Sequence, residues 1–280
     1  TLLLASSAAC AEIGSVVDLT GTAIIKRAKE TITVTKGTVI ETNDKVETKN
    51  GVVNIKFKDN TTVKVTENSA LVIDDFVYDP KSKSGSKLAV KVALGTVRYA
   101  SGQIAKSNPQ NVAVTTPTAT IGVRGTDFTA TVDEVGASTI ILLPSCPEGY
   151  INKITFDIEK DCKTGQIIVE TDVGQVILNQ PFQATKVTSR NAPPPKPVLL
   201  KLTEDAISNI LILSPPPQLS KDEKSEKKGI EMRSALDVDF LKENGLTNAL
   251  DEQQKNVFQD KLSQNALENS FLVDMWSILG

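Results

Sequence analysis

Residues 114–128 read VTTPTATIGVRGTDF, and this stretch indicates how the chain folds. Val, Thr and Ile dominate it, and β-branched side chains fit the pleated surface of a β-strand. Gly122 and Gly125 bracket Val123 and Arg124. Glycine at these positions allows a β-bulge or the close approach of another strand. The segment therefore predicts a tight corner between β-strands.

The side chains of this corner predict a packed junction. We expect Ile121, Val123 and Phe128 to be core residues. Arg124 and Asp127 lie close enough in sequence to form a bidentate ion pair across the kink, which would satisfy the guanidinium. The segment is thus predicted to be mainly architectural, with a partner-contacting surface as the alternative.

The same strand-forming residue types, mainly Val, Ile and Thr, extend over residues 13–188. Apolar and polar residues alternate in stretches such as 53–57 (VNIKF) and 62–65 (TVKV). Alternation at period two gives each strand one buried and one wet face. Turn signals rich in Asn, Asp and Gly separate the strands, for example at residues 58–60 and 172–174. The pattern predicts a mainly β fold, an antiparallel sandwich or barrel-like meander with no helix in this part.

The composition changes after Arg190. Residues 191–197 read NAPPPKP, which predicts a stiff polyproline-like linker. A short apolar helix is expected around residues 203–213, ended by three prolines. We therefore predict a β domain over residues 12–190, a Pro-rich and charged linker over residues 191–229, and a helical region over residues 230–280.

Within residues 230–280 the pattern predicts helices. Ser234 and Asp237 fit a capping box, and Gly245 would end that helix. Apolar residues at helical spacing then form one face: Phe271, Leu272, Met275, Trp276 and Leu279. This face would either pack on its own domain and neighbouring helices or dock a partner protein.

Residues 1–11 read TLLLASSAACA, which is typical of the end of a secretory signal peptide. Small residues flank a cleavage site at Ala9-Cys10-Ala11, so the mature chain would begin near Glu12. Two alternatives are a lipidated Cys10, against which Ser7 stands in place of the usual Leu, and the tail of a membrane anchor. Cleavage predicts a periplasmic protein with no membrane span in the mature chain.

Cleavage would leave two cysteines, Cys146 and Cys162. An even count in an exported protein predicts one disulfide between them. The alternative is a pair of buried thiols.

Charge and composition exclude several classes of function. The chain has 31 Lys and Arg against 34 Asp and Glu, so it lacks the basic excess of a nucleic-acid-binding protein. It contains no histidine, which removes Ser-His-Asp and Cys-His catalysis. The tempting carboxylate pairs, Asp74 with Asp75 and Asp157 with Glu159, show neither the cleft of a glycosidase nor the oxygen ligands of a calcium site. We therefore expect no enzyme activity, no cofactor and no metal.

The motif TPTATIGVRGTDF resembles the signature of the FecR domain family, T-P-x-A-x-x-G-V-R-G-T-x-F. Weaker similarities precede it at residues 14–17, 21–23, 44–48 and 56–62, so the resemblance covers residues 12–145. It singles out as site residues Thr116, Pro117, Gly122, Val123, Arg124, Gly125, Thr126, Asp127 and Phe128.

The resemblance implies a periplasmic all-β module. In founding members this module follows a cytoplasmic anti-sigma segment and a membrane helix, and it relays iron-siderophore occupancy from an outer-membrane receptor. The expected function is a non-catalytic protein-protein interaction or scaffold module of the Gram-negative cell envelope, with an envelope protein as its partner. The alternatives are a sensory regulator of iron-siderophore signalling and a cell-wall or carbohydrate-binding module. Aromatic residues, on which sugars stack, make up only 4% of the chain.

Overall fold

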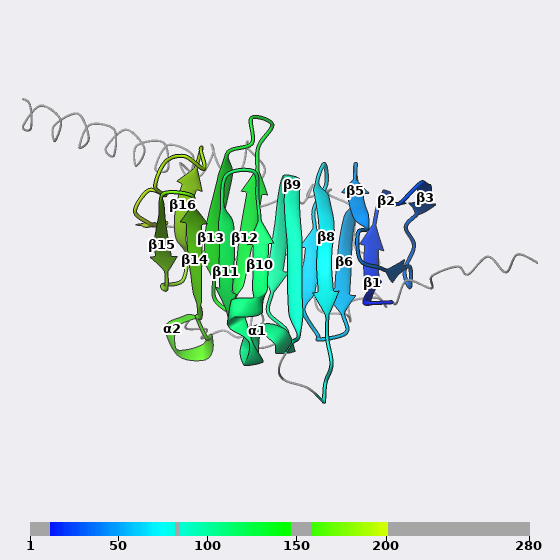
Figure 1. Ribbon diagram of the computed structural model, residues 1–280, viewed down its shortest axis with the longest axis horizontal. Coiled ribbons are helices and arrows are strands. Elements are labelled where there is room, and N and C mark those ends of the chain that lie inside the picture. The colour runs from blue at the N-terminus through cyan, green and yellow to red at the C-terminus, as the bar shows by residue number, and fades with distance from the viewer. Residues whose placement is uncertain (1–11, 82–84, 147–157, 201–280) are drawn as a thin grey trace, which may run out of the picture.

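A computed structural model describes residues 12–81, 85–146 and 158–200. Within these residues the fold is mainly β, as predicted, and its strands form two sheets, A and B, that do not close into a barrel. The barrel-like alternative is therefore wrong. Figure 1 shows the strands standing side by side along the long axis of the molecule, from β1–β3 at one end to β14–β16 at the other.

Sheet A contains both the first and the last strands of the described chain. In spatial order it consists of β4 (Val39–Ile40), β1 (Gly14–Thr20), β6 (Val52–Phe57), β7 (Thr62–Val65), the second half of β9 (Lys87–Ala100), β12 (Asp127–Val132), β13 (Ser138–Leu143), β16 (Gln183–Val187) and β17 (Val198–Leu199).

Sheet B is built from the intervening segments. In spatial order it consists of β3 (Glu30–Thr33), β2 (Ala23–Arg27), β5 (Lys45–Thr48), β8 (Ala70–Val77), the first half of β9, β10 (Val112–Thr115), β11 (Thr120–Arg124), β14 (Gln166–Thr171) and β15 (Gly174–Leu178). The chain thus passes repeatedly from one sheet to the other as it advances along the molecule.

The two sheets enclose one hydrophobic core. Alternate residues of most strands enter it, for example Val53, Ile55 and Phe57 of β6, because successive side chains of a strand point to opposite faces. Phe57 of sheet A stacks on Phe76 of sheet B, with their ring centroids 5.5 Å apart. The predicted core residues Ile121, Val123 and Phe128 are all buried, which confirms that part of the expectation.

Strand β9 belongs to both sheets. Its first half pairs with β8 and its second half, after Gly95, pairs with β7 and β12. Gly95 has a φ of +74°, a conformation that L side chains rarely adopt, and a side chain there would meet Ser69. The glycine therefore lets one continuous strand cross between the layers.

The connection from β9 to β10 departs from the predicted fold. The first half of β9 pairs with β10 in parallel, and a parallel pair requires a crossover. The crossover contains α1 (Gln103–Ser107) and the 3₁₀ helix η1 (Pro109–Asn111). Helix α1 buries Ile104 and Ala105. We predicted no helix in this region, because five residues are too few to show a helical period.

The β domain continues beyond the boundary predicted at Arg190. The hydroxyl of Thr185 donates to the carbonyl of Pro195 (2.9 Å), and that of Thr171 to the carbonyl of Ala192 (2.8 Å). Thr171 lies in sheet B and Thr185 in sheet A, so the proline-rich segment bridges the two sheets and then forms β17. Residues 191–197 are therefore part of the domain rather than a spacer beyond it.

The other predicted C-terminal features, including the helix at residues 203–213 and the region 230–280, lie outside the described residues, as does the signal segment. Among the residues that the structure describes, none of the helices is both long and apolar enough to cross a membrane.

Candidate interaction surfaces

The turn between β10 and β11 contains Thr116 and Pro117, the first signature residues. The Thr116 hydroxyl accepts hydrogen bonds from the backbone N–H of Ala119 (3.0 Å) and from the hydroxyl of Ser138 (2.8 Å). The neighbouring Thr118 hydroxyl donates to the carbonyl of Val187 (2.9 Å). Thr116 and Thr118 are both buried. These hydroxyls replace the strand hydrogen bonds that the turn interrupts, so the turn is an architectural corner.

Arg190 fastens the same turn from the far end of the domain. Its Nε donates to the carbonyl of Pro117 and its Nη2 to the carbonyl of Thr116, both at 3.3 Å. Its Nη1 lies 3.5 Å from Oδ1 of Asp172. Arg190 therefore joins the β10–β11 turn to the β14–β15 turn, a role that no local sequence signal indicated.

The turn between β11 and β12 contains Gly125 and Thr126. Gly125 has a φ of +59°, in the left-handed region that favours glycine. The backbone N–H of Thr126 donates to the Ser101 hydroxyl (2.9 Å), and that hydroxyl donates to the carbonyl of Thr126 (2.7 Å). The N–H of Gly165 donates to the Thr126 hydroxyl (3.3 Å). This second corner is therefore held rigidly by contacts from distant segments.

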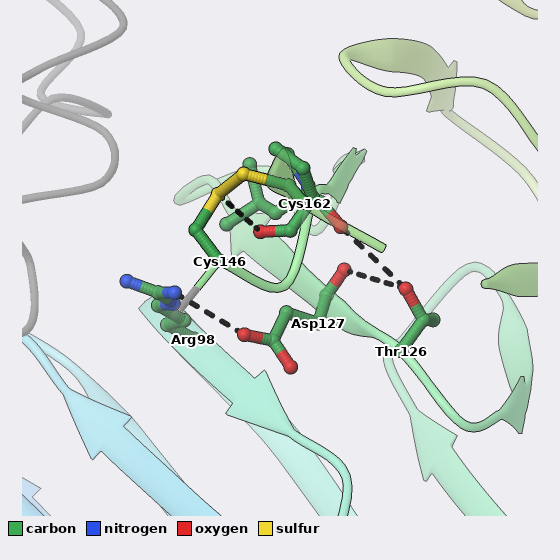
Figure 2. Close-up of a disulfide and its surroundings, with 7 residues drawn as sticks. Arg98, Thr126, Asp127, Cys146 and Cys162 are labelled. Carbon is green, nitrogen blue, oxygen red and sulfur yellow. Dashed lines mark hydrogen bonds and ion pairs between the residues drawn. A yellow bond between two sulfur atoms is a disulfide. The ribbon is translucent and has the colours of Figure 1, made fainter. Parts of the chain in front are cut away.

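Asp127 pairs with Arg98 and not with Arg124, so the predicted ion pair is wrong. Nη2 of Arg98 lies 3.3 Å from Oδ2 of Asp127, and both side chains are largely buried (Figure 2). The chain changes sheets at the β11–β12 turn. Arg124 consequently points outward from sheet B and Asp127 outward from sheet A, away from each other. Burial raises the pKa of the Asp127 carboxyl, while the charge of Arg98 opposes this shift.

The predicted disulfide is confirmed. Cys146 and Cys162 are bonded, with their Cα atoms 4.3 Å apart. Beside it, Ser145 and Lys163 form an isolated antiparallel bridge. Figure 2 places the disulfide next to Arg98, Asp127 and Thr126. The bond therefore anchors the segment after β13, and the short helix α2 (Ile158–Asp161), at the signature corner.

One row of residues crosses the outer face of sheet A, the face turned away from the core. In register, from β1 to β17, the row consists of Asp18, Asn54, Lys64, Arg98, Thr129, Ile141, Ala184 and Val198. Asp18 is exposed and Lys64 half-buried, whereas Thr129 is 0% and Ile141 1% exposed. The outer face of sheet A is therefore exposed to solvent at the end formed by β1, β6 and β7, which we call the wet end. It is buried at the end formed by β12, β13 and β16, which we call the dry end.

Lys64 and Arg98 are cross-strand neighbours in this row. Burial, together with the nearby charge of Arg98, lowers the pKa of Lys64 to about 8, while the charge of Asp18 acts in the opposite direction. Two cations thus lie side by side at the boundary between the wet and the dry part of the face.

Arg124 differs from the other polar signature residues. It is exposed, and within the described part of the chain its side chain makes no hydrogen bond and no ion pair. Thr116, Thr126 and Asp127 are all engaged within the fold.

Gly122 was expected to allow a bulge or a close strand approach, yet a Cβ there would meet only Ile168, at 3.9 Å. That expectation is therefore wrong for Gly122. Gly125 instead adopts a left-handed turn conformation.

Two aspartates that sequence reasoning did not single out as site residues also hold the fold. Asp44 is 0% exposed and accepts two hydrogen bonds from Arg27, each 2.7 Å long. Asp59 is also 0% exposed and accepts from the backbone N–H groups of Thr61 (3.0 Å) and Ile104 (3.2 Å). Their turn positions were visible in the sequence, but their long-range partners were not.

A groove of about 560 Å³ lies around β2, β5 and the β8–β9 region. Its lining includes Ile24, Lys45, Glu47 and Leu94, and none of the lining residues is aromatic. Hydrogen bonds from Lys26 and Lys45 lower the pKa of Glu47, which keeps this carboxyl ionised.

The candidate docking residues Phe271, Leu272, Met275, Trp276 and Leu279 lie outside the described residues.

Comparison with known proteins gives a family and a weak structural likeness. The family described as FecR protein matches residues 44–144. No curated protein matches the chain. Two crystal structures of a proposed anti-sigma factor from Parabacteroides distasonis ATCC 8503, at 2.50 and 1.65 Å resolution, are 13% identical. Their TM-scores are 0.37 and 0.36, and each match covers 54% of this chain and 57% of that chain. The match thus spans little more than half of those proteins.

Proposed function

The protein carries a FecR domain over residues 44–144, and on this premise we propose that it is a non-catalytic protein-binding module of the Gram-negative cell envelope, located in the periplasm. One observation carries the proposal. Arg124 lies exposed at the β11–β12 turn, whereas the other polar signature residues, Thr116, Thr126 and Asp127, are engaged within the fold.

Arg124 is suited to contact a partner. Its guanidinium offers a planar set of donors that matches a carboxylate bidentately, and arginine is common among the residues that dominate protein interfaces. The adjacent turn is rigid, because Gly125 takes a left-handed conformation and Thr126 is bound to Ser101 and Gly165. A rigid base reduces the entropy lost on binding. The expected counterpart is an acidic group on an envelope protein.

Three carboxylates of the described chain are committed to the fold, which supports a non-catalytic role. Asp44, Asp59 and Asp127 each accept hydrogen bonds or ion pairs within the fold. The chain also contains no histidine to act as a base. A periplasmic location agrees with the disulfide between Cys146 and Cys162, since such bonds persist in oxidising compartments.

A sensory regulator is the second candidate, and the FecR match favours it. A sigma-factor gene beside the gene for this protein would support that role, and its absence would count against it. The groove around β2 and β5 offers little to a carbohydrate, because sugars stack on aromatic side chains and none lines it.

Cross-linking in the native periplasm, followed by mass spectrometry, tests the proposal. The full chain would be compared with Arg124→Glu and with Lys91→Glu, an equal charge change at an exposed residue of β9 on the outer face of sheet B. We expect one envelope protein to be captured by the parent and by Lys91→Glu, with at least a tenfold loss in Arg124→Glu.

A third variant, Phe271→Asp with Leu272→Asp, separates the two candidate contacts. Loss of the partner only in this variant would assign binding to the C-terminal residues and not to Arg124. Equal capture by all four proteins, or no specific partner in any of them, would contradict the proposed function.

A further inference from the structure

We propose that residues 201–213 (KLTEDAISNILIL) fold back over the dry part of the outer face of sheet A and form a third layer on the sandwich. This inference does not depend on the proposed function. It concerns β9, β12, β13 and β16, and the segment that directly follows β17.

The burial of this face calls for a covering layer. Thr129, Leu143 and Ala184 are 0% exposed and Ile141 is 1% exposed. Ile141, Leu143 and Ala184 are nevertheless not part of the core between the sheets. Their register partners show that they point to the opposite face, in line with Arg98 and Asp127. A strand such as β13, with buried residues on both faces, is typical of a sheet covered on both sides.

The chain leaves the described structure at the edge of this face. Val198 of β17 pairs with Ala184, and the N–H of Leu200 donates to the carbonyl of Phe182 (3.1 Å). Leu200 is only 6% exposed and also lies outside the core between the sheets. The next residue therefore starts at the edge of this face, two strand spacings from β13.

The length of the segment fits the span. Four strand spacings separate β17 from β9, which is about 19 Å at about 4.8 Å per spacing. The helix predicted over residues 203–213 would be about 16 Å long. Residues 201 and 202 would supply the remaining reach.

The chemistry of the segment also fits the face. Ile207, Ile210 and Leu211 recur at helical spacing and would form one apolar side. Glu204 and Asp205 add two negative charges to a face that carries Lys64, Arg98 and Lys186. Apolar contact over Ile141 and Leu143, with acids toward the cations, gives this segment a single favoured placement.

Photo-cross-linking in the full-length protein identifies the occupant. One variant carries Ile207→p-benzoylphenylalanine, and a matched control carries Phe271→p-benzoylphenylalanine in the other apolar C-terminal stretch. After irradiation and digestion, we expect position 207 to link to peptides of β12, β13 or β16, and position 271 not to reach them.

Mixing isotopically light and heavy protein before irradiation separates contacts within one chain from contacts between chains. Links from position 207 to this face within one chain support the proposal. Three results would overturn it: no link from position 207 to these strands, links to them only between chains, or links to them from position 271 alone.

A charge reversal gives a second, independent readout. Glu204→Lys with Asp205→Lys should reduce the yield of the links from position 207 several-fold, because the added cations face Lys64 and Arg98. The same reversal at Glu268 and Asp274 is the control and should leave the yield unchanged. An unchanged yield in the Glu204 and Asp205 variant would contradict the placement of the acids.

Discussion

The two ends of sheet A use the same strand architecture for different purposes. In β6 and β7, Val53, Ile55 and Val63 face the core, while Lys56 and Thr62 on the other face are exposed. In β12 and β13 both faces carry buried residues, with Thr129 and Ile141 buried on the outer face. The same transverse row contains Asn54 at one end and Ile141 at the other.

This difference shows that the two ends of one sheet can differ in how far their outer face is removed from water. The wet end needs only the packing between the two sheets. The dry end also has the disulfide, the Arg98–Asp127 pair and a set of apolar residues on its second face. Substitutions at matched positions of this row, one at each end, should therefore change the free energy of unfolding by very different amounts.

The largest effect is expected when the amide side chain of the wet end and the apolar side chain of the dry end are exchanged. Ile141→Asn should lower the free energy of unfolding by about 3–5 kcal/mol, because it removes a buried apolar side chain and buries an amide. Asn54→Ile, at a half-buried site, should change it by less than about 1 kcal/mol. Urea denaturation of both variants measures the contrast. Similar losses at the two positions would mean that the ends do not differ in the way described.

Removing the disulfide should have the next largest effect. The double variant Cys146→Ser with Cys162→Ser opens a loop with a sequence separation of 16, for which chain entropy predicts a loss of about 3 kcal/mol. The thermal midpoint should fall in the variant, and a reductant should lower that of the parent to a similar value. A parent protein whose midpoint does not respond to complete reduction would show that the bond contributes nothing at the dry end.

Breaking the buried pair should cost somewhat less. Asp127→Asn leaves Arg98 with a neutral neighbour and should destabilise the fold by about 2–3 kcal/mol. A double-mutant cycle with Arg98→Met measures the coupling between the two side chains. The same cycle on Lys87 and Asp75, an ion pair on sheet B with half-exposed side chains, is the control and should give less than about 1 kcal/mol. Equal coupling in the two cycles would contradict the burial of the first pair.

The smallest effect concerns Lys64 and depends on pH. Its pKa is lowered to about 8 in the folded protein from an ordinary value of 10.5, so the unfolded chain binds more protons between these values. The stability of the parent should therefore rise relative to Lys64→Met as the pH increases from about 8 to 10.5. Below pH 8, where Lys64 is charged in both the folded and the unfolded state, the difference between the two proteins should no longer change with pH. Denaturation curves at pH 7 and pH 10.5 test this, and a constant difference would show that the pKa of Lys64 is not lowered.

Much of the fold could be predicted from local sequence. Alternation at period two identified the strands, and the turn residues identified many of their ends. Cysteine parity predicted the bond between Cys146 and Cys162. The signature VTTPTATIGVRGTDF contains two turns, one on each side of β11, and threonine hydroxyls replace backbone partners in both.

What could not be predicted depends on contacts between distant residues. Arg98 is the partner of Asp127 because β9 and β12 are neighbours in register, and no local pattern specifies that register. Arg190 contacts Pro117 across 73 residues of sequence. The proline-rich segment resembled a spacer because its composition is that of a linker, whereas its carbonyls accept hydrogen bonds from Thr171 and Thr185.

The division of sheet A is tested most directly by thiol reactivity at two threonines on its outer face. Thr62→Cys and Thr129→Cys would be labelled with a maleimide in the native full-length protein, with the disulfide intact, and quantified by mass spectrometry. Thr62 is exposed and Thr129 is 0% exposed. The thiol at position 129 should react roughly a hundredfold more slowly, because labelling there requires a local opening that costs about 3 kcal/mol. Equal rates at the two positions would contradict the existence of a dry half on this face.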